Sequence, residues 1–299
     1  TRFNEDALRI LRALRFASVY GFSIEENTSK SIFKNADLLK NIATERVISE
    51  FLKLICGKDA VKILDAYRET IAVIIPEITV MFNFNQNNIH HSYDLWQHTL
   101  TALGTIEPNP MLRMTMLLHD IGKPFVKTTD NSGQSHFQGH QLESKKIADR
   151  ILHRLRLPSD FINKTLLLIE YHDVRFNGSK KLMKKVMNVL GTDLTKQLLE
   201  VEHADISAQS EYQREEKLGY LKKAKTHLNE IIKDNECFKL SQLDINGKDV
   251  LNLGVKEGRD VGNILDYLLM LVVDANVPNK KSILISKAKE YIYGNQINK

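Results

Sequence analysis

A histidine and an aspartate stand side by side in the stretch MLLHDIGKP, residues 116–124, at the end of an apolar segment. Imidazole nitrogens and carboxylate oxygens together suit a divalent cation such as Fe, Mn, Co, Ni, Mg or Zn. His119 and Asp120 are therefore candidate metal ligands. Lys123 lies three residues beyond the pair and is a candidate contact for a phosphate group.

Side chains of the same types recur between residues 90 and 205, most of them at the ends of segments with a helical pattern. A helix end can aim an imidazole or a carboxylate into the space between packed helices, so these residues can converge on one site. The further candidate ligands are His98, His140, His172 and Asp205, and His136 belongs to the same run. Such a site can lower the pKa of bound water and neutralise phosphate oxygens, which favours phosphate-ester chemistry.

Each of these histidines also has a simpler interpretation, because a single histidine on a helix is more often a packed or surface residue than a ligand. That interpretation is kept for His90, His153 and His227. His203 lies two positions before Asp205, and residues two apart on a helix point to different faces. Asp205 is therefore expected in the site and His203 outside it.

The segments that carry these residues are expected to be helices. Only 6 prolines and 14 glycines interrupt the chain, and apolar residues recur at spacings of three and four. The sequence therefore predicts an all-α, multi-domain helical fold, with a turn-rich loop at 127–140 and a break at 232–250. The expected helices span 5–20, 28–40, 43–55, 58–69, 92–106, 110–119, 139–155, 159–171, 180–190, 193–208, 211–232, 258–274 and 280–293.

The composition bounds the class of protein. The 299 residues are enough for two or three domains, and hydrophobic residues at 42% with charged residues at 26% are typical of a globular protein. The longest apolar run, YLLMLVV at 267–273, is shorter than the ~20 residues that cross a bilayer, so we expect a cytoplasmic protein. Cys56 and Cys237 lie far apart and are expected to be reduced. The net charge of +5 permits a nucleic-acid partner without establishing one.

The first segment, RFNEDALRILRALRFASVYGFSI, predicts an amphipathic helix with a basic edge. On one helix Asp6 and Arg9 share a face, and Glu5 can form a surface ion pair with Arg9. Alternatively, a carboxylate that accepts hydrogen bonds and a guanidinium that donates them can read a nucleobase. Cytosine and adenine both present an amino donor beside a ring-nitrogen acceptor, so an Asp–Arg pair would accept both and reject uracil and guanine.

The order of the histidine and aspartate motifs resembles a known superfamily. The stretches HSYDLWQHTLTAL, LLHDIGKP, HFQGH, EYHD and EHADISA follow one another as in the HD superfamily of metal-dependent phosphohydrolases, whose pattern is H…HD…D. The resemblance implies catalytic roles for Asp120 and Lys123 and two metal positions. The first ion would be held by His98, His119, Asp120 and Asp205, and the second would use His140 and His172.

The flanking segments resemble a second family. RFNEDALRILRALRFA…GFSI, TSKSI and ERVISEFLKL are similar to the neck and body of bacterial class II CCA-adding tRNA nucleotidyltransferases, which are kin to poly(A) polymerases. INGKDVLNLGVKEGRDVGNILDYLLMLVVD resembles their tail. The resemblance implies a neck and body at 1–87, an HD domain at 88–210 and a tRNA-binding tail at 211–299. It also implies ATP and CTP as substrates and tRNA as partner, with a nucleotide site of Glu5, Asp6, Arg9, Arg12 and Arg15.

The family's catalytic head, with its glycine-serine loop and paired aspartates, is expected to precede Thr1, so the sequence is expected to be a fragment that does not transfer nucleotides alone. The HD site would act on phosphate or cyclic phosphate at RNA ends. Two alternatives stay open: a stand-alone HD phosphohydrolase and a non-catalytic RNA-binding module. The lysine-rich stretches KKLMKK, LKKAK and NKKSILISKAK fit either a solvated surface or contacts to the tRNA backbone.

Overall fold

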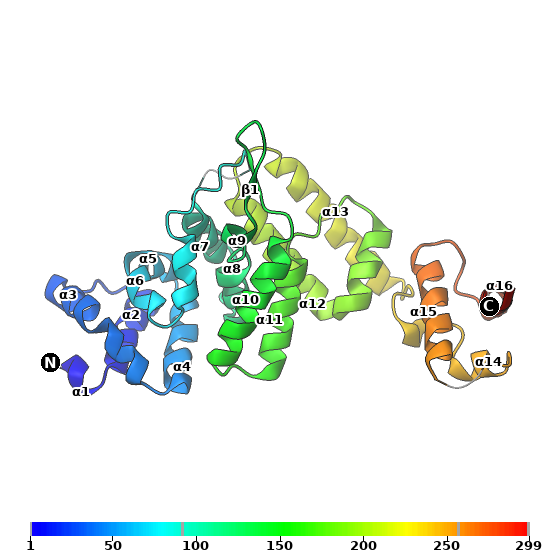
Figure 1. Ribbon diagram of the computed structural model, residues 1–299, viewed down its shortest axis with the longest axis horizontal. Helices are drawn as coiled ribbons and strands as arrows, with labels where there is room; N and C mark the ends of the chain where they lie inside the picture. The colour runs from blue at the N-terminus through cyan, green and yellow to red at the C-terminus, as the bar shows by residue number, and fades with distance from the viewer. Residues whose placement is uncertain (1, 91–92, 256–257, 298–299) are drawn as a thin grey trace. The chain divides into compact units, whose positions relative to one another are not determined.

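The computed structural model describes residues 2–90, 93–255 and 258–297, and over these ranges the chain is almost entirely helical (Figure 1). The expected all-α fold is confirmed. The described residues form one sheet, the hairpin of β1 (Thr128–Thr129) and β2 (Ser135–His136), paired antiparallel inside the expected loop at 127–140. Residues 256 and 257 of the expected tail segment lie outside the described residues.

The chain packs into two compact units. The first combines Thr1–Arg175 with Lys196–Leu218, and the second combines Phe176–Thr195 with Gly219–Lys299. Packing thus groups the expected body and HD domain into one unit and assigns the start of α12 (Lys180–Ala208) to the other. The division at residues 87 and 210 into three functional parts stays a prediction.

The first unit begins with a bundle of short helices whose core is aliphatic. Leu11 and Leu14 of α2 are fully buried, and α2 packs on α4, where the Ser18 hydroxyl donates to the Leu54 carbonyl at 2.6 Å. The chain breaks between α1 and α2, so the single helix expected at 5–20 is wrong at its start. The elements are α1 (Arg2–Glu5), α2 (Leu8–Tyr20), α3 (Glu26–Asn35), η1 (Ala36–Asn41), α4 (Thr44–Ile55), α5 (Ala60–Ala66), α6 (Arg68–Ala72) and η2 (Pro76–Met81).

The helices that position the candidate ligands follow in the same unit. Their starts are set by local chemistry: the Asp94 carboxylate accepts from the Gln97 amide, and Asn109 accepts from two amides of the next helix. Seven consecutive residues of this next helix, 112–118, are buried, so its end is fixed inside the unit. The elements are α7 (Leu95–Thr105), α8 (Pro110–Leu118), α9 (Lys123–Val126), α10 (His140–Arg154) and α11 (Ser159–Tyr171), together with the end of α12.

Gly191 interrupts α12 with a backbone of φ 71° and ψ 174°, which lies outside the helical region. The sequence predicted separate helices at 180–190 and 193–208, and the interruption falls between them. The remaining elements are α13 (Arg214–Lys233), η3 (Leu240–Gln242), α14 (Gly247–Leu251), α15 (Arg259–Val273) and α16 (Lys281–Ile297).

The apolar run at 267–273 belongs to α15, where Leu268, Leu269 and Val273 pack with Leu284 of α16 in the core of the second unit. Among the described helices none is long and apolar enough to cross a membrane.

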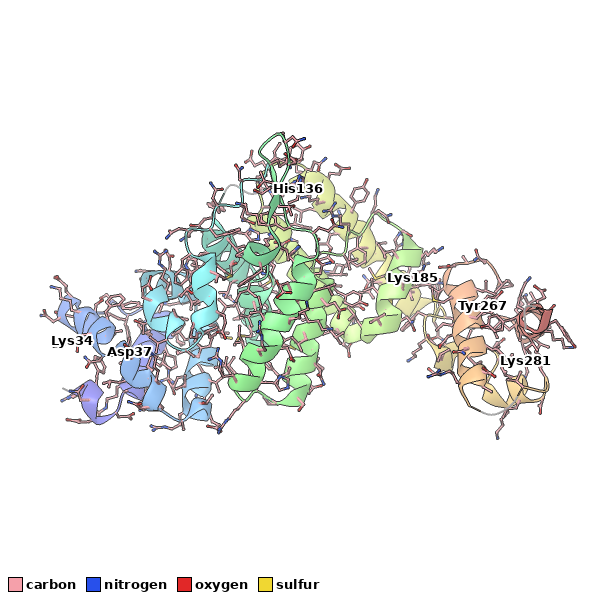
Figure 2. The ribbon with its side chains drawn as sticks, viewed as in Figure 1. Lys34, Asp37, His136, Lys185, Tyr267 and Lys281 are labelled. Carbon is pink, nitrogen blue, oxygen red and sulfur yellow. The ribbon has the colours of Figure 1, made fainter. Side chains whose placement is uncertain are left out.

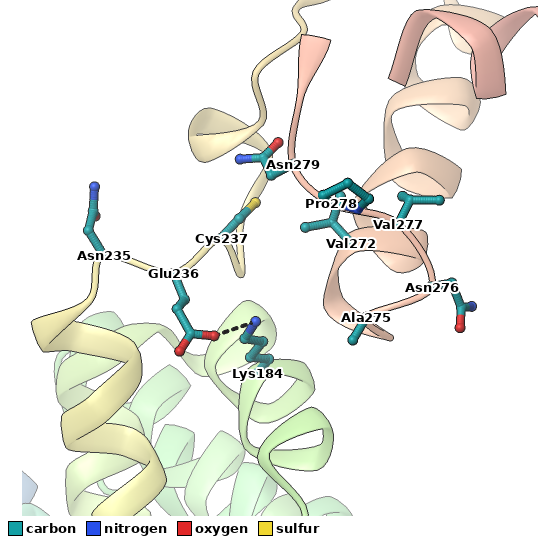
Figure 3. Close-up of a pocket in the computed structure, with 10 residues that line it drawn as sticks. All are labelled: Lys184, Asn235, Glu236, Cys237, Val272, Ala275, Asn276, Val277, Pro278 and Asn279. Carbon is teal, nitrogen blue, oxygen red and sulfur yellow. Dashed lines mark ion pairs between the residues drawn. The ribbon is translucent and has the colours of Figure 1, made fainter. Parts of the chain in front are cut away.

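The lysines of KKLMKK are paired within the second unit. Lys181 and Lys185 contact Asp274 Oδ1 at 3.1 and 3.0 Å, while Lys180 and Lys184 pair with Glu236. The Lys184–Glu236 pair, at 2.7 Å, lines a pocket beside Cys237, whose thiol has its pKa raised by burial (Figure 3). This lysine patch is therefore partly neutralised by the protein itself.

Gly122 is required where α9 begins against α10. Its backbone, at φ −80° and ψ −17°, is open to any residue, but an added Cβ would lie 2.5 Å from Ser144 N and 2.6 Å from His140 O. We therefore expect Gly122→Ala to destabilise the protein by ~1–3 kcal/mol through overpacking, measured by urea unfolding. Gly219→Ala is the control, because nothing lies within 4 Å of that position and alanine favours the helix. Equal stability of both variants would contradict this account.

Candidate metal centre

The structure brings four candidate ligands from three helix regions to one point. His98 lies on α7, His119 and Asp120 follow α8, and Asp205 lies in the last turn of α12. His98 Nε2 is 2.9 Å from Asp205 Oδ1 and 3.4 Å from Asp120 Oδ2. His119 Nε2 is 3.1 Å from Asp120 Oδ2 and 3.5 Å from Asp205 Oδ1. One ligand atom from each of the four lies within 4.8 Å of all the others.

A second group shares Asp120 with the first. His140 opens α10 and His172 follows α11, and their Nε2 atoms lie 3.2 and 3.6 Å from Asp120 Oδ1. The two Nε2 atoms are 3.1 Å apart. One oxygen of Asp120 thus faces the first group and the other faces the second. A carboxylate with this placement can bridge two cations.

The four imidazoles are held by their other ring nitrogen. A backbone carbonyl only accepts hydrogen bonds, so each Nδ1 carries the proton and each Nε2 is left as the potential ligand. For His119, His140 and His172 the carbonyl belongs to the residue three positions earlier, at 2.7, 2.9 and 2.7 Å. His98 Nδ1 instead lies 3.3 Å from the Ala208 carbonyl, 110 residues away in the sequence.

Burial leaves polar atoms of the centre unsatisfied. Among the described residues, neither His119 Nε2 nor Asp120 Oδ1 has a hydrogen bond of good geometry, although both atoms are buried. Unsatisfied buried atoms are costly unless something else binds them. With four imidazoles and two carboxylates around them, the donor set fits one or two divalent cations of the imidazole- and oxygen-binding kind.

Charge within the centre reinforces this fit. Burial alone would lower the pKa of His119, but the charges and hydrogen bonds of Asp120 and Asp205 outweigh it and raise that pKa to about 10. Burial opposes ionisation of Asp120, yet His119 and Lys123 hold its pKa well below the usual value. The buried carboxylate is therefore ionised and needs cationic partners, which protons or a metal ion can supply.

Lys123 lies inside the centre. Its Nζ is 2.7 Å from Asp120 Oδ2 and 3.0 Å from Oε1 of the buried Gln86, a residue that no sequence pattern had pointed to. Its expected contact with a phosphate group stays a prediction.

Two other histidines are outside the centre. His136 lies on the hairpin (Figure 2), is half exposed and pairs with Asp130 at 2.7 Å. His203 is exposed, in agreement with the prediction that Asp205, and not His203, lies on the helix face that is turned inward.

Sequence reasoning missed two residues near Asp205. Gln209, one turn further along, donates its Nε2 to Asp205 Oδ2 at 2.9 Å, and its spacing of four was the available signal. Glu202 is buried, and burial together with the charges of Asp205 and Asp173 raises its pKa well above the usual value.

The N-terminal candidates form ion pairs. Arg9 Nη1 lies 2.9 Å from Glu5 Oε2, both largely exposed, as the simpler interpretation expected. Asp6 lies in the break before α2, where its Oδ1 accepts from the Leu8 amide and its Oδ2 lies 3.4 Å from Arg46. Asp6 therefore does not share a helix with Arg9. Arg12 is exposed, whereas Arg15 is mostly buried and lies 3.2 Å from Glu50.

Two family models match the chain. One, described as "Probable RNA and SrmB-binding site of polymerase A", matches residues 21–82. The other, described as "tRNA nucleotidyltransferase domain 2", matches residues 140–288. The matched regions include α3 to α6 of the bundle at the start of the first unit and the segments that carry His140, His172 and Asp205.

Relatives agree with these models. The CC-adding tRNA nucleotidyltransferase of Thermus thermophilus is 29% identical over 93% of this chain and 65% of its own length. The Multifunctional CCA protein of Legionella pneumophila is 30% identical over 62% of this chain and 48% of its own length. The chain thus spans about half to two thirds of the curated relatives it matches.

The fold also resembles that of a solved structure. The CCA-adding enzyme of Bacillus stearothermophilus in complex with CTP is similar over 100% of this chain and 65% of that chain, with a TM-score of 0.67 and 21% identity. The two matched regions place the chain among helical proteins whose models are named for RNA binding and for tRNA nucleotidyl transfer. The chain belongs to the tRNA nucleotidyltransferase family that includes the CCA-adding enzymes.

The shared carboxylate gives a sharp test of metal binding. Because Asp120 belongs to both groups, Asp120→Asn should abolish binding of every ion at the centre. His172→Gln removes a ligand from the second group alone and should leave one ion per chain in place of two. Metal content after dialysis against Mn²⁺ measures both results, with His136→Gln as the control because that residue lies outside the centre. Metal retained in full by Asp120→Asn would rule this arrangement out.

Proposed function

We propose that the protein acts in the maturation of tRNA 3′ ends and that its buried centre is a metal-dependent phosphohydrolase. The phosphohydrolase proposal rests on the two groups of candidate metal ligands that share Asp120. Its substrate would be a phosphate monoester or a cyclic phosphate at the end of an RNA or on a free nucleotide. The first part rests on the family and on its relatives, which are CC-adding and multifunctional CCA proteins.

The proposed hydrolysis joins a water oxygen to phosphorus and breaks one phosphorus–oxygen ester bond, whose oxygen leaves with a proton. Divalent cations at such a centre supply charge neutralisation and activated water. The chain's own contribution is to hold Asp120 ionised, to fix the four imidazoles by their Nδ1 donors and to keep Lys123 beside the carboxylate. These groups are buried, which strengthens their interaction with a phosphate.

We further propose that Glu5, Asp6, Arg9, Arg12 and Arg15 serve nucleotide addition with CTP and ATP. Arg9 and Arg12 are exposed one turn apart on α2, so both are accessible to a nucleotide. The contact between Asp6 and Arg46, at 3.4 Å, is long, and a base that pairs with the carboxylate could replace it.

Hydrolysis is tested directly with the Mn²⁺-loaded chain and a 2′,3′-cyclic nucleotide. We expect turnover that falls by at least ~100-fold in Asp120→Asn, because the change removes a ligand from both groups. Binding of tRNA should be unchanged in the same variant, which separates a damaged centre from a misfolded chain. A metal-loaded wild-type chain with tRNA binding but no turnover would favour the non-catalytic RNA-binding alternative.

Contacts to the tRNA backbone predict a salt-dependent affinity. Lys222 on α13 is exposed, whereas Lys185 is already paired with Asp274 at 3.0 Å. If α13 contacts phosphates, Lys222→Ala should reduce the slope of log affinity against log salt by about 1. Lys185→Ala should change the slope less, because its charge is compensated within the protein. Equal slopes for the wild type and both variants, measured by filter binding, would argue against phosphate contacts at α13.

A further inference from the structure

A short chain of hydrogen bonds leads from the centre to a lysine beyond it. Gln209 donates its Nε2 to Asp205 Oδ2 at 2.9 Å, and its Oε1 accepts from Lys217 Nζ at 2.6 Å. Lys217 lies in the first turns of α13, within the first unit and half buried. The ammonium group is thus held in a fixed place, two hydrogen bonds from a candidate metal ligand.

Several charged groups act on this lysine. Burial lowers the pKa of Lys217, the carboxylate of Asp205 partly offsets this, and the neighbouring guanidinium of Arg175 lowers the pKa further. Asp173 raises it and Lys123 lowers it. Two further cations, Arg175 and Lys123, therefore oppose the charge of Lys217. An anion bound at Lys217 would offset this repulsion.

An aromatic pair lies next to the same lysine. Lys217 Nζ is 3.4 Å from His90 Nδ1, and the His90 ring packs against the Tyr212 ring with centroids 5.1 Å apart. Ser210 fixes this pair, because its amide donates to the His90 carbonyl at 2.9 Å and its hydroxyl donates to the Ile89 carbonyl at 2.7 Å. Tyr212 is 45% exposed, so part of its side chain is accessible to a ligand.

We propose that Lys217 is a phosphate-positioning residue of the centre and that the His90–Tyr212 pair stacks on the base of the same substrate. The inference rests on the proposed hydrolase function and narrows its substrate to a nucleotide, free or at an RNA end, with a terminal or cyclic phosphate. Gln209 sets the position of the ammonium group, and stacking on an aromatic surface tolerates any of the four bases.

The test uses the Mn²⁺-loaded full chain and begins with binding of inorganic phosphate, measured by isothermal titration calorimetry. Lys217→Met should weaken phosphate binding ~10–100-fold, the loss expected for one charge-assisted hydrogen bond, with metal content unchanged. Lys217→Arg should restore most of the affinity. Lys225→Met, an exposed lysine two turns along α13, is the matched control and should bind phosphate as the wild type does.

Turnover separates the roles of the lysine and the rings. Lys217→Met should raise KM for both p-nitrophenyl phosphate and a 2′,3′-cyclic nucleotide. Tyr212→Leu should raise KM for the nucleotide by ~10-fold, about the worth of one stacked base, and leave p-nitrophenyl phosphate unaffected. A short RNA with a 3′-terminal phosphate, compared with the mononucleotide, distinguishes an RNA end from a free nucleotide as the better substrate.

The outcomes separate this inference from the function on which it rests. Hydrolysis with unchanged KM and phosphate affinity in Lys217→Met would overturn the inference and leave the proposed function standing. Loss of metal in the same variant would also overturn the inference. Lys217 would then act by positioning the metal ligand Asp205 through Gln209 and not by binding phosphate. If the wild-type chain hydrolyses neither substrate, but Lys217→Met weakens phosphate binding, the hydrolase function would be overturned. The anion site at Lys217 would then be supported.

Discussion

The ionised carboxylate of Asp120, buried among four imidazoles and a lysine, is the constraint around which the first unit is organised. A buried charge is tolerated only near opposite charge, and imidazole or ammonium nitrogens lie within 3.6 Å of both Asp120 oxygens. Supplying them requires the first turns of α7, α9 and α10 and the ends of α8 and α11 to meet at one point. The buried face of α8 and the close approach at Gly122 follow from that requirement.

Much of this arrangement could be predicted from the sequence because it depends on local rules. Spacing along a helix separated Asp205 from His203, and the helical pattern stopped on either side of Gly191. The break at Asp6 was missed, because an aspartate that accepts from an amide two residues later looks the same in sequence as an aspartate inside a helix. Gln86 and Lys217 were missed for another reason: their partners lie far away in the sequence or across a turn, where no periodicity reports them.

Charge was the least informative property of the sequence. The stretch KKLMKK suggests a basic surface, yet Glu236 and Asp274 pair with its lysines. Near the centre the opposite is true: Arg175 and Lys217 lie in stretches that show no charge pattern, yet Arg175 lowers the pKa of Lys217. The distribution of charge that a ligand meets is therefore set by tertiary pairing more than by composition.

The hydrogen bonds that orient the imidazoles differ in how much chain they span. Three histidines are fixed by a carbonyl three residues earlier, so their geometry is complete once a single helix end has formed. His98 depends on a carbonyl 110 residues away and cannot be oriented until α12 has docked. During synthesis from the N-terminus, Asp120, His140 and His172 are all made before Asp205. The centre would therefore assemble in two steps. The group of Asp120, His140 and His172 could bind a cation first, and the group that needs Asp205 would be completed later.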